Sequence, residues 1–270
     1  MKIRLGILVL LFGLTLSAQD TSTFSSYETL EGVKIIQIQD NLCAILYPTH
    51  FFGVQIKGDK RLKDIIKWDF KDAVLKLYTT EENTTASYAE ITLYVKDFEE
   101  LRLSGNASVQ TDEKMVMETF ILNSGGNSSY NFPMECTDFT LISAGESTGY
   151  LDLTAESVHV QTKNNASTSI KTLGGRVSVE LTDNSIVGLR GTAHALSATV
   201  NKKARLTAWA LKAEDVYLFS SSTADIEIYA KNRLKINGQA NSKIYVTGYP
   251  RQIDTININK KTNIFYHARN

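Results

Sequence analysis

The chain has 270 residues, of which 43% are hydrophobic, and its 29 Lys and Arg balance its 29 Asp and Glu, so that the formal net charge is zero. This composition is typical of a folded chain with a large core and excludes an intrinsically disordered one. Because a chain without excess positive charge lacks the bulk attraction to phosphate, we expect no nucleic-acid partner.

The N-terminus has the pattern of a secretion signal. Lys2 and Arg4 precede an apolar run over residues 5–16, which is shorter than the roughly 20 residues that span a bilayer but fits a signal-peptide core. We expect residues 1–18 to be a signal peptide cleaved after Ala18, with a retained membrane anchor as the alternative. No later segment approaches the length of a membrane span, so we expect the mature chain to have no transmembrane segment. The mature chain is expected in the periplasm, at the cell surface or secreted.

Residues 19–100 are strand-rich but show no fixed spacing. Short apolar or alternating runs predict strands over Val33–Gln39, Cys43–Tyr47, Gly53–Lys57, Asp64–Phe70, Ala73–Tyr78 and Glu90–Val95. We expect this part to cap one end of the repeat that follows, because an open terminal repeat exposes a strand edge and apolar side chains.

Residues 101–255 carry an internal repeat. The apolar residues that open each repeat are Leu101, Phe120, Phe139, Val158, Val177, Leu196, Val216, Leu234 and Ile253, at intervals of 19, 19, 19, 19, 19, 20, 18 and 19 residues. A second apolar column lies two positions further on, at Leu103, Leu122, Leu141, Val160, Val179, Ala198, Leu218 and Ile236. Apolar residues two apart with polar ones between them predict a strand with one buried face.

Each repeat then turns a corner. Small residues follow the opener by eight positions, at Ser128, Ser147, Ala166, Ser185, Ala204, Ala224 and Ser242. The residues before them are mostly polar turn formers: Asn127, Glu146, Asn165, Asn184, Lys203, Thr223 and Asn241. Because Asn adopts the left-handed backbone readily, we expect this preceding position to make the turn.

A second strand follows each corner. Its inward residues are expected to be Leu151 and Leu153, Ile170 and Thr172, Leu189 and Gly191, Ala208 and Ala210, Ile228 and Ala230, and Val246 and Gly248. A repeat of this length cannot fold alone, so equivalent strands must stack and pair at about 4.8 Å. The sequence therefore predicts an all-β fold, a right-handed parallel β-helix (solenoid) with about 19-residue rungs and an N-terminal strand-rich cap.

Three other β or repeat folds fit less well. The sequence lacks the six-residue apolar period of a left-handed β-helix and the fixed Asn or Cys of a leucine-rich repeat. An immunoglobulin-like sandwich would need several hairpin turns, and Asn237-Gly238 is the only Asn-Gly pair. Residues 256–270, in which apolar and polar residues alternate, are expected to close the far end as a strand pair.

Several segments together resemble a known family. The segments YAEITLYVKDFEELRLSGNASV (residues 88–109), LKINGQANSKIYVTGYP (residues 234–250), GVQIKGDKRLKDIIKWDF and DAVLKLY are similar to those of the putative auto-transporter adhesin, head GIN domain family. The resemblance covers about residues 27–255. It implies an exported β-helical domain of a kind frequent in Bacteroidetes-type bacteria, and it brings no catalytic residues with it.

The reactive residue types do not gather in the sequence. Cys43 and Cys136 can form a disulfide in an exported protein, but we expect both to be buried as small apolar residues. The four histidines are scattered without the spacing of metal ligands, so we expect no metal and no cofactor. We also expect no enzyme activity, because acids such as Asp152, Glu180 and Glu227 fall in different rungs or columns.

Candidate binding residues share one offset in successive rungs. Arg190, Trp209 and Tyr229 should stack at about 5 Å on the outward face of the second strand, with Tyr245 beside them. Such aromatic residues beside charges suit sugar rings or a protein partner. The alternative is that they only stabilise the stack.

Charge is distributed unevenly along the chain. Residues 97–160 contain eleven Asp or Glu and two Lys or Arg, a net charge of −9, and residues 217–270 contain eight Lys or Arg and three Asp or Glu, a net charge of +5. Stacking in sequence order would therefore give the rod a basic end that includes Lys260 and Lys261. We expect a non-catalytic exported surface protein that binds a glycan or an envelope protein, with a polysaccharide-processing enzyme or a passive spacer as alternatives.

Overall fold

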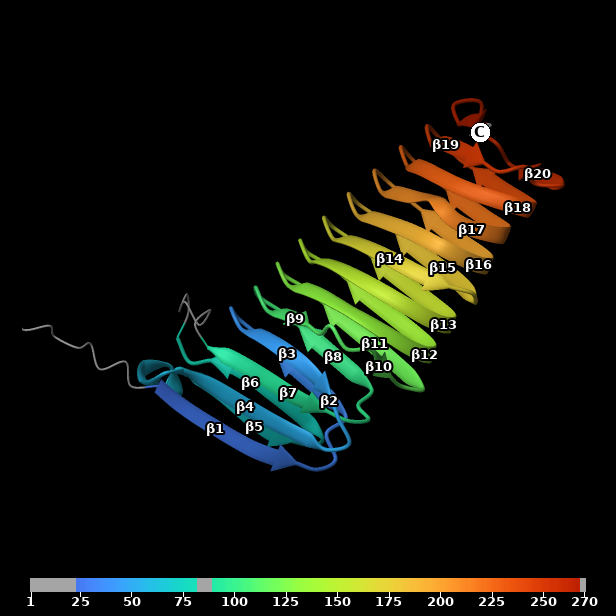
Figure 1. Ribbon diagram of the computed structural model, residues 1–270. Coiled ribbons are helices and arrows are strands. Elements are labelled where there is room, and N and C mark those ends of the chain that lie inside the picture. Colours follow the sequence, from blue (N-terminus) through green and yellow to red (C-terminus); the bar gives the residue numbers. More distant parts are fainter. Residues whose placement is uncertain (1–22, 82–88, 268–270) are drawn as a thin grey trace, which may run out of the picture.

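The computed structural model describes residues 23–81 and 89–267, and these form a rod of stacked rungs (Figure 1). The rod is a parallel β-solenoid of about nine turns, which confirms the predicted fold class and the spacing of about 19 residues. The expected signal peptide, residues 1–18, lies outside the described residues.

Each rung adds one strand to each of two walls, which we call wall 1 and wall 2. Wall 1 contains β5 (Ile66–Lys71), β6 (Val74–Thr79), β2 (Ile35–Ile38), β8 (Glu100–Leu103), β11 (Thr119–Ser124), β15 (Arg176–Leu181) and β20 (Gln252–Ile256). Wall 2 contains β1 (Thr23–Leu30), β4 (Phe52–Asp59), β7 (Glu90–Val95), β3 (Cys43–Pro48), β9 (Ser108–Gln110), β10 (Met115–Val116), β14 (Ser167–Leu173), β19 (Lys243–Thr247) and β21 (Asn263–His267). Five long strands begin in wall 2 and continue through a return corner into wall 1: β12 (Ser129–Ser143), β13 (Thr148–Thr162), β16 (Ile186–Val200), β17 (Arg205–Ser220) and β18 (Asp225–Gly238).

The repeat columns of the sequence are real ladders from Phe120 onward. Phe120 pairs with Phe139, Phe139 with Val158, and the ladder continues through every later opener to Ile253. From Phe120 to Leu234 these openers are almost fully buried between the walls. Like residues therefore lie above like residues, and the core is a set of continuous apolar columns.

The first interval of the repeat was predicted wrongly. Leu101 pairs with Leu122 rather than with Phe120, so this rung has 21 residues instead of 19. The two extra residues belong to the loop between β9 and β10, where Thr111 accepts a hydrogen bond from the Glu113 amide at 3.0 Å. Residues 112–114 of this loop are exposed, and strand pairing at 19-residue spacing begins at Met115.

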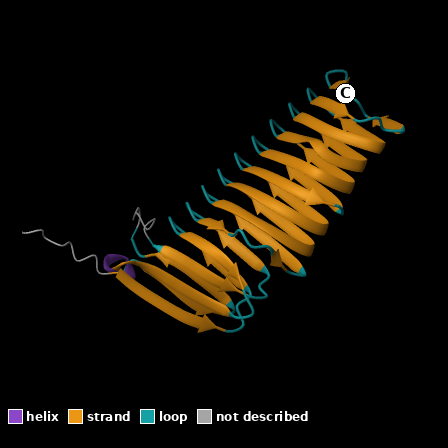
Figure 2. Cartoon of the chain, in the orientation of Figure 1, coloured by secondary structure: helices purple, strands orange, loops and turns teal. Residues whose placement is uncertain are grey.

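The corners between wall 1 and wall 2 line up along one edge of the rod (Figure 2). The small residues predicted to mark the corners are fully buried from Ser128 to Ser242. The left-handed residue, however, lies one position earlier than expected, at Asn164 (φ 63°) and Asp183 (φ 67°) for example. The Asn column instead links the rungs through its backbone, since the Asn184 amide donates to the Asn164 carbonyl oxygen at 2.9 Å.

The N-terminal part contains all six predicted strands, but their order in space differs from their order in the chain. The rung of β2 and β3 lies between the rung of β6 and β7 and the rung of β8 and β9. Antiparallel strands then cover the end: β4 pairs with β7, β1 with β4, and β5 with β6. A 3₁₀ helix, η1 (Lys60–Lys63), places Leu62 in the core there.

The C-terminal residues form a last incomplete rung rather than a closing pair. β20 pairs with β18 in wall 1, and β21 pairs with β19 in wall 2, both in parallel. No rung lies beyond them in the described part of the chain, so Ile253 and Tyr266 are exposed although they continue inward columns. The prediction of a strand pair was wrong because the alternating pattern of residues 254–266 also fits one more rung.

Candidate binding face

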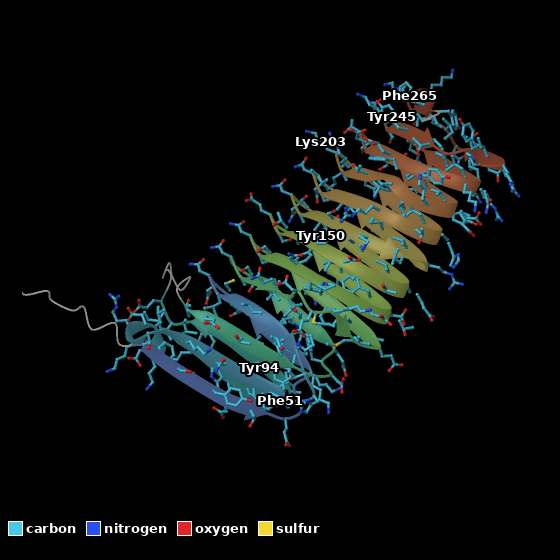
Figure 3. The ribbon with its side chains drawn as sticks, viewed as in Figure 1. Phe51, Tyr94, Tyr150, Lys203, Tyr245 and Phe265 are labelled. Carbon is cyan, nitrogen blue, oxygen red and sulfur yellow. The ribbon has the colours of Figure 1, made fainter. Side chains whose placement is uncertain are left out.

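The outward surface of wall 2 carries the residues predicted for binding. Alternate residues of each wall 2 strand point away from the core. The ladders align these residues along the rod except where the register shifts between β16 and β17 and between β17 and β18. We call this surface the wall 2 face. Its aromatic side chains lie at several levels along the rod (Figure 3).

Arg190 contacts a tyrosine two rungs nearer the N-terminus. Its Nη2 atom donates to the Tyr150 hydroxyl at 2.7 Å, and its guanidinium carbon lies 5.4 Å from the ring centroid. The ladder above Tyr150 continues with Ser169 and Gly188, whose small size leaves room for the Arg190 side chain. The resulting pair combines a hydrogen bond with a cation–π contact.

Trp209 lies in an irregular part of the ladder. Arg190 pairs with Ala210 rather than with Trp209, because the register between β16 and β17 shifts after Gly188. The predicted stack of Arg190 below Trp209 is therefore wrong, and so is the inward position of Ala210, since Leu211 and Ala213 fill the core instead. The Trp209 side chain remains 41% exposed.

Tyr229 and Tyr245 complete the predicted group. Lys212 Nζ lies 4.2 Å from the centroid of the Tyr229 ring, which is a second cation–π contact. The Tyr245 ring stacks on Phe265 of the last rung at 4.9 Å. The four predicted residues thus lie on one face in four successive rungs: Arg190 in β16, Trp209 in β17, Tyr229 in β18 and Tyr245 in β19. We call these four residues the C-terminal patch.

A second aromatic group at the other end of the face was not predicted. Tyr94 of β7 lies at its centre, with Tyr27 at 5.9 Å and Tyr47 at 5.8 Å in edge-to-face contact and Phe51 stacked at 5.6 Å. These four residues are named the cap cluster. Alternation within residues 43–47 and 90–95 is consistent with outward positions for Tyr47 and Tyr94. Only the pairing of β1 with β4 and of β7 with β3 and β4 brings the cluster together.

Lys260 and Lys261 are exposed in the corner turn between β20 and β21. The rungs from β8 to β21 stack in sequence order, so the acidic residues 97–160 and the basic residues after 217 lie in different parts of the rod. The basic end does not form one site, because Arg233 lies in β18, where it pairs with Asp215 at 3.7 Å, and Lys243 lies on the wall 2 face.

A groove of about 830 Å³ follows the return corner from β10 to β16. Its lining includes Val116, Cys136, Ala155 and Leu173 together with the charged or ionisable Glu135, Glu156, Arg176 and His194. Burial raises the pKa of the Cys136 thiol to about 11, so the thiol is protonated at neutral pH and is not an activated nucleophile.

The two cysteines differ in environment, and both are free thiols. Cys136 is buried as predicted. Cys43 is exposed because Ala44 and Leu46 take the inward positions of β3, so its predicted burial was wrong. Within residues 23–81 and 89–267, no group of three His, Cys, Asp or Glu side chains is arranged to hold a metal ion. The same residues include no helix of the length and apolarity needed to cross a membrane.

The sequence relationship now decides the family. The model of the family described as putative auto-transporter adhesin, head GIN domain, matches residues 35–250. The chain belongs to this head GIN domain family. None of the curated proteins matches the chain.

Solved structures share the fold at low sequence identity. A putative adhesin from Parabacteroides merdae superposes with a TM-score of 0.66 at 14% identity, covering 92% of this chain and 98% of its own. A putative adhesin from Parabacteroides distasonis gives 0.64 at 14% identity, and a putative lipid binding protein from the same species gives 0.56 at 15% identity, both with the same coverage. At such identities these likenesses show the fold of the head GIN domain and nothing finer.

Proposed function

We propose that this head GIN domain protein is an exported, non-catalytic adhesin module that binds a surface glycan through its wall 2 face. The observation that carries the proposal is the C-terminal patch, where Trp209 is exposed and Tyr229 lies under Lys212. Aromatic rings cover the apolar faces of sugar rings, and neighbouring cations and hydroxyls contact the polar edges. The family description and the neighbours described as putative adhesins support a binding role.

The proposal includes export of the protein to the periplasm or the cell surface. The basic and apolar pattern of residues 1–18 is that of a cleaved signal peptide. Mass measurement of the mature protein, purified from its producing cells, tests this part. We expect a chain that begins at Gln19, and a mature chain that retains residues 1–18 would contradict it.

A polysaccharide-processing enzyme is less well supported by the geometry. Glycoside hydrolysis uses two carboxyl groups about 5 to 10 Å apart. Asp152 pairs with Lys171 at 2.8 Å, and four strand steps of about 4.8 Å separate its strand from that of Glu227. Glu180 lies on wall 1.

The experiment measures binding and turnover on the same samples. Purified mature protein is titrated with mannan, xylan and polygalacturonate, and the mixtures are assayed for new reducing ends and unsaturated products. We expect binding without turnover, and we expect the Trp209→Ser/Tyr229→Thr variant to bind at least tenfold more weakly than the wild type. Reproducible turnover would overturn the non-catalytic proposal, and wild-type binding by a folded double variant would remove the C-terminal patch from it.

A further inference from the structure

The cap cluster has the composition of a sugar-binding platform. It presents three tyrosine hydroxyls and four aromatic rings, and Tyr27 and Tyr47 are 50% and 44% exposed. Backbone geometry holds it in place, because Gly53 leaves room for the Tyr27 ring, whose hydroxyl oxygen would lie 3.2 Å from an added Cβ. The rings contact one another, yet Tyr27 and Tyr47 keep about half of their surface exposed, so a ligand can reach the cluster.

The chemistry around the cluster indicates an uncharged contact. Gln55 accepts a hydrogen bond from the Tyr94 hydroxyl at 3.4 Å, and the nearest ion pair, Lys57 with Glu90 at 3.8 Å, has no net charge. Toward the middle of the face follow the exposed amides of Gln110 and Asn131. Amides and hydroxyls between aromatic rings match the hydroxyl groups and apolar faces of pyranose sugars.

The cap cluster and the C-terminal patch lie on the same face at a fixed separation. Eight strand steps lead from Tyr94 in β7 to Tyr229 in β18, which is about 38 Å at the usual strand spacing. Tyr150 of β13 lies halfway, four steps from either end, and contacts Arg190 of the C-terminal patch. Three aromatic positions along one rigid face can contact one extended chain but not one small ligand.

We infer that the cap cluster is a second glycan-binding site and that the ligand of the wall 2 face is a long linear polysaccharide that contacts both ends of the face at once. This inference rests on the proposed function and adds the class of ligand. Binding at the second site is then intramolecular, so the polymer binds far more tightly than either site binds a short oligosaccharide. A rigid rod suits this mode because its sites need no ordering when the polymer binds.

The test compares polymer and trisaccharide binding in matched variants of the mature chain. Mannan, xylan and polygalacturonate serve as probes, each as a polymer and as its trisaccharide. The variant Tyr47→Thr/Tyr94→Thr removes the cap cluster with residues that favour strands. Tyr217→Thr is the control, since Tyr217 is comparably exposed (37%) but lies on wall 1. Tyr27→Ser, on the edge strand β1, is the second variant if the double variant does not fold.

We expect a polymer bound by the wild type to bind the cap variant at least tenfold more weakly, while trisaccharide binding at the C-terminal patch is unchanged. The Tyr217→Thr control should bind like the wild type. Unchanged polymer affinity in the folded cap variant, or equal affinity for polymer and trisaccharide, would overturn this inference and leave the proposed function standing. Absence of wild-type binding to all three polymers would overturn both.

Discussion

The central rungs and the N-terminal cap are built from the same kind of short strand but are ordered by different rules. From β11 to β18 each rung lies on the rung before it, and a residue meets its counterpart about 19 positions later. In the cap, the rung of β2 and β3 separates two rungs that follow it in the chain, and β1, β4 and β5 run antiparallel to their neighbours. A regular stack gives stability by repetition, whereas the cap brings together side chains that are distant in sequence, such as those of the cap cluster.

The largest expected effect is on the regular stack. Val179→Asp places a carboxylate in a column between Val160 and Ala198, all nearly fully buried. No partner for the charge is present in this column, so we expect a loss of about 3–5 kcal/mol of unfolding free energy, measured by chemical denaturation. Ser178→Asp, on the outward side of the same strand, is the control and should change stability by less than about 0.5 kcal/mol. Equal losses in the two variants would contradict the assignment of inward and outward faces.

Substituting one glycine in the stack and one in the cap by alanine compares how the two regions tolerate an added methyl group. Gly191 (φ 110°) in β16 would place a Cβ 2.0 Å from the Thr172 carbonyl oxygen of the rung below. Gly32 (φ 74°), before β2, would place a Cβ in open space. We expect Gly32→Ala to lower the unfolding free energy by about 1 kcal/mol, because an alanine is strained in the left-handed backbone conformation. Gly191→Ala should cost about 2 kcal/mol more, since the rungs must separate. Thermal unfolding measures both, and similar melting temperatures would show that the stack tolerates such separation.

The sequence predicts the regular stack better than it predicts the N-terminal cap. Fixed spacing identifies the ladder from Phe120 to Ile253 because each opener must fill the same place between the walls. The pattern could not locate the register shift at Gly188, since an extra residue in β17 leaves the alternation on either side intact. Because of this shift, Arg190 pairs with Ala210 rather than with Trp209. The cap cluster depends on the parallel pairing of β3 with β7 and on the antiparallel pairing of β4 with β7 and of β1 with β4. These strands are distant in sequence, so no local pattern records their pairing.

The stability of the stack should depend on alkaline pH because β12 buries two weakly acidic side chains, Tyr130 and Cys136. Burial raises the pKa of Tyr130 to about 12 and that of Cys136 to about 11. Ordinary values in an unfolded chain are about 10 and 8.5. As the pH rises, each group loses its proton in the unfolded state before it does so in the folded state, which favours unfolding. The unfolding free energy therefore falls from about pH 8.5 to 11 because of the thiol, and from about pH 10 to 12 because of the phenol. We expect the unfolding free energy to fall by about 1–2 kcal/mol between pH 8 and pH 10. Cys136→Ala should reduce this slope, and an unchanged slope would assign it to other groups.

The smallest expected effect concerns the charge difference between the ends of the rod. Lys260 and Lys261 are exposed in the last corner turn, where an anionic polysaccharide on the wall 2 face would meet net positive charge. Exposed charges contribute up to about 1 kcal/mol each and are screened as the Debye length falls from about 10 Å at 0.1 M salt to 3 Å at 1 M. We therefore expect Lys260→Glu/Lys261→Glu to weaken polygalacturonate binding several-fold at low salt and to have no effect at high salt or on mannan. Lys203→Glu, in a corner turn of the central stack, is the matched control for the single variant Lys261→Glu, because each changes the net charge by the same amount (Figure 3). Since Lys203 lies farther from the basic end, Lys203→Glu should weaken binding less than Lys261→Glu. An equal effect of these two single variants would mean that net charge, rather than its position along the rod, governs the attraction.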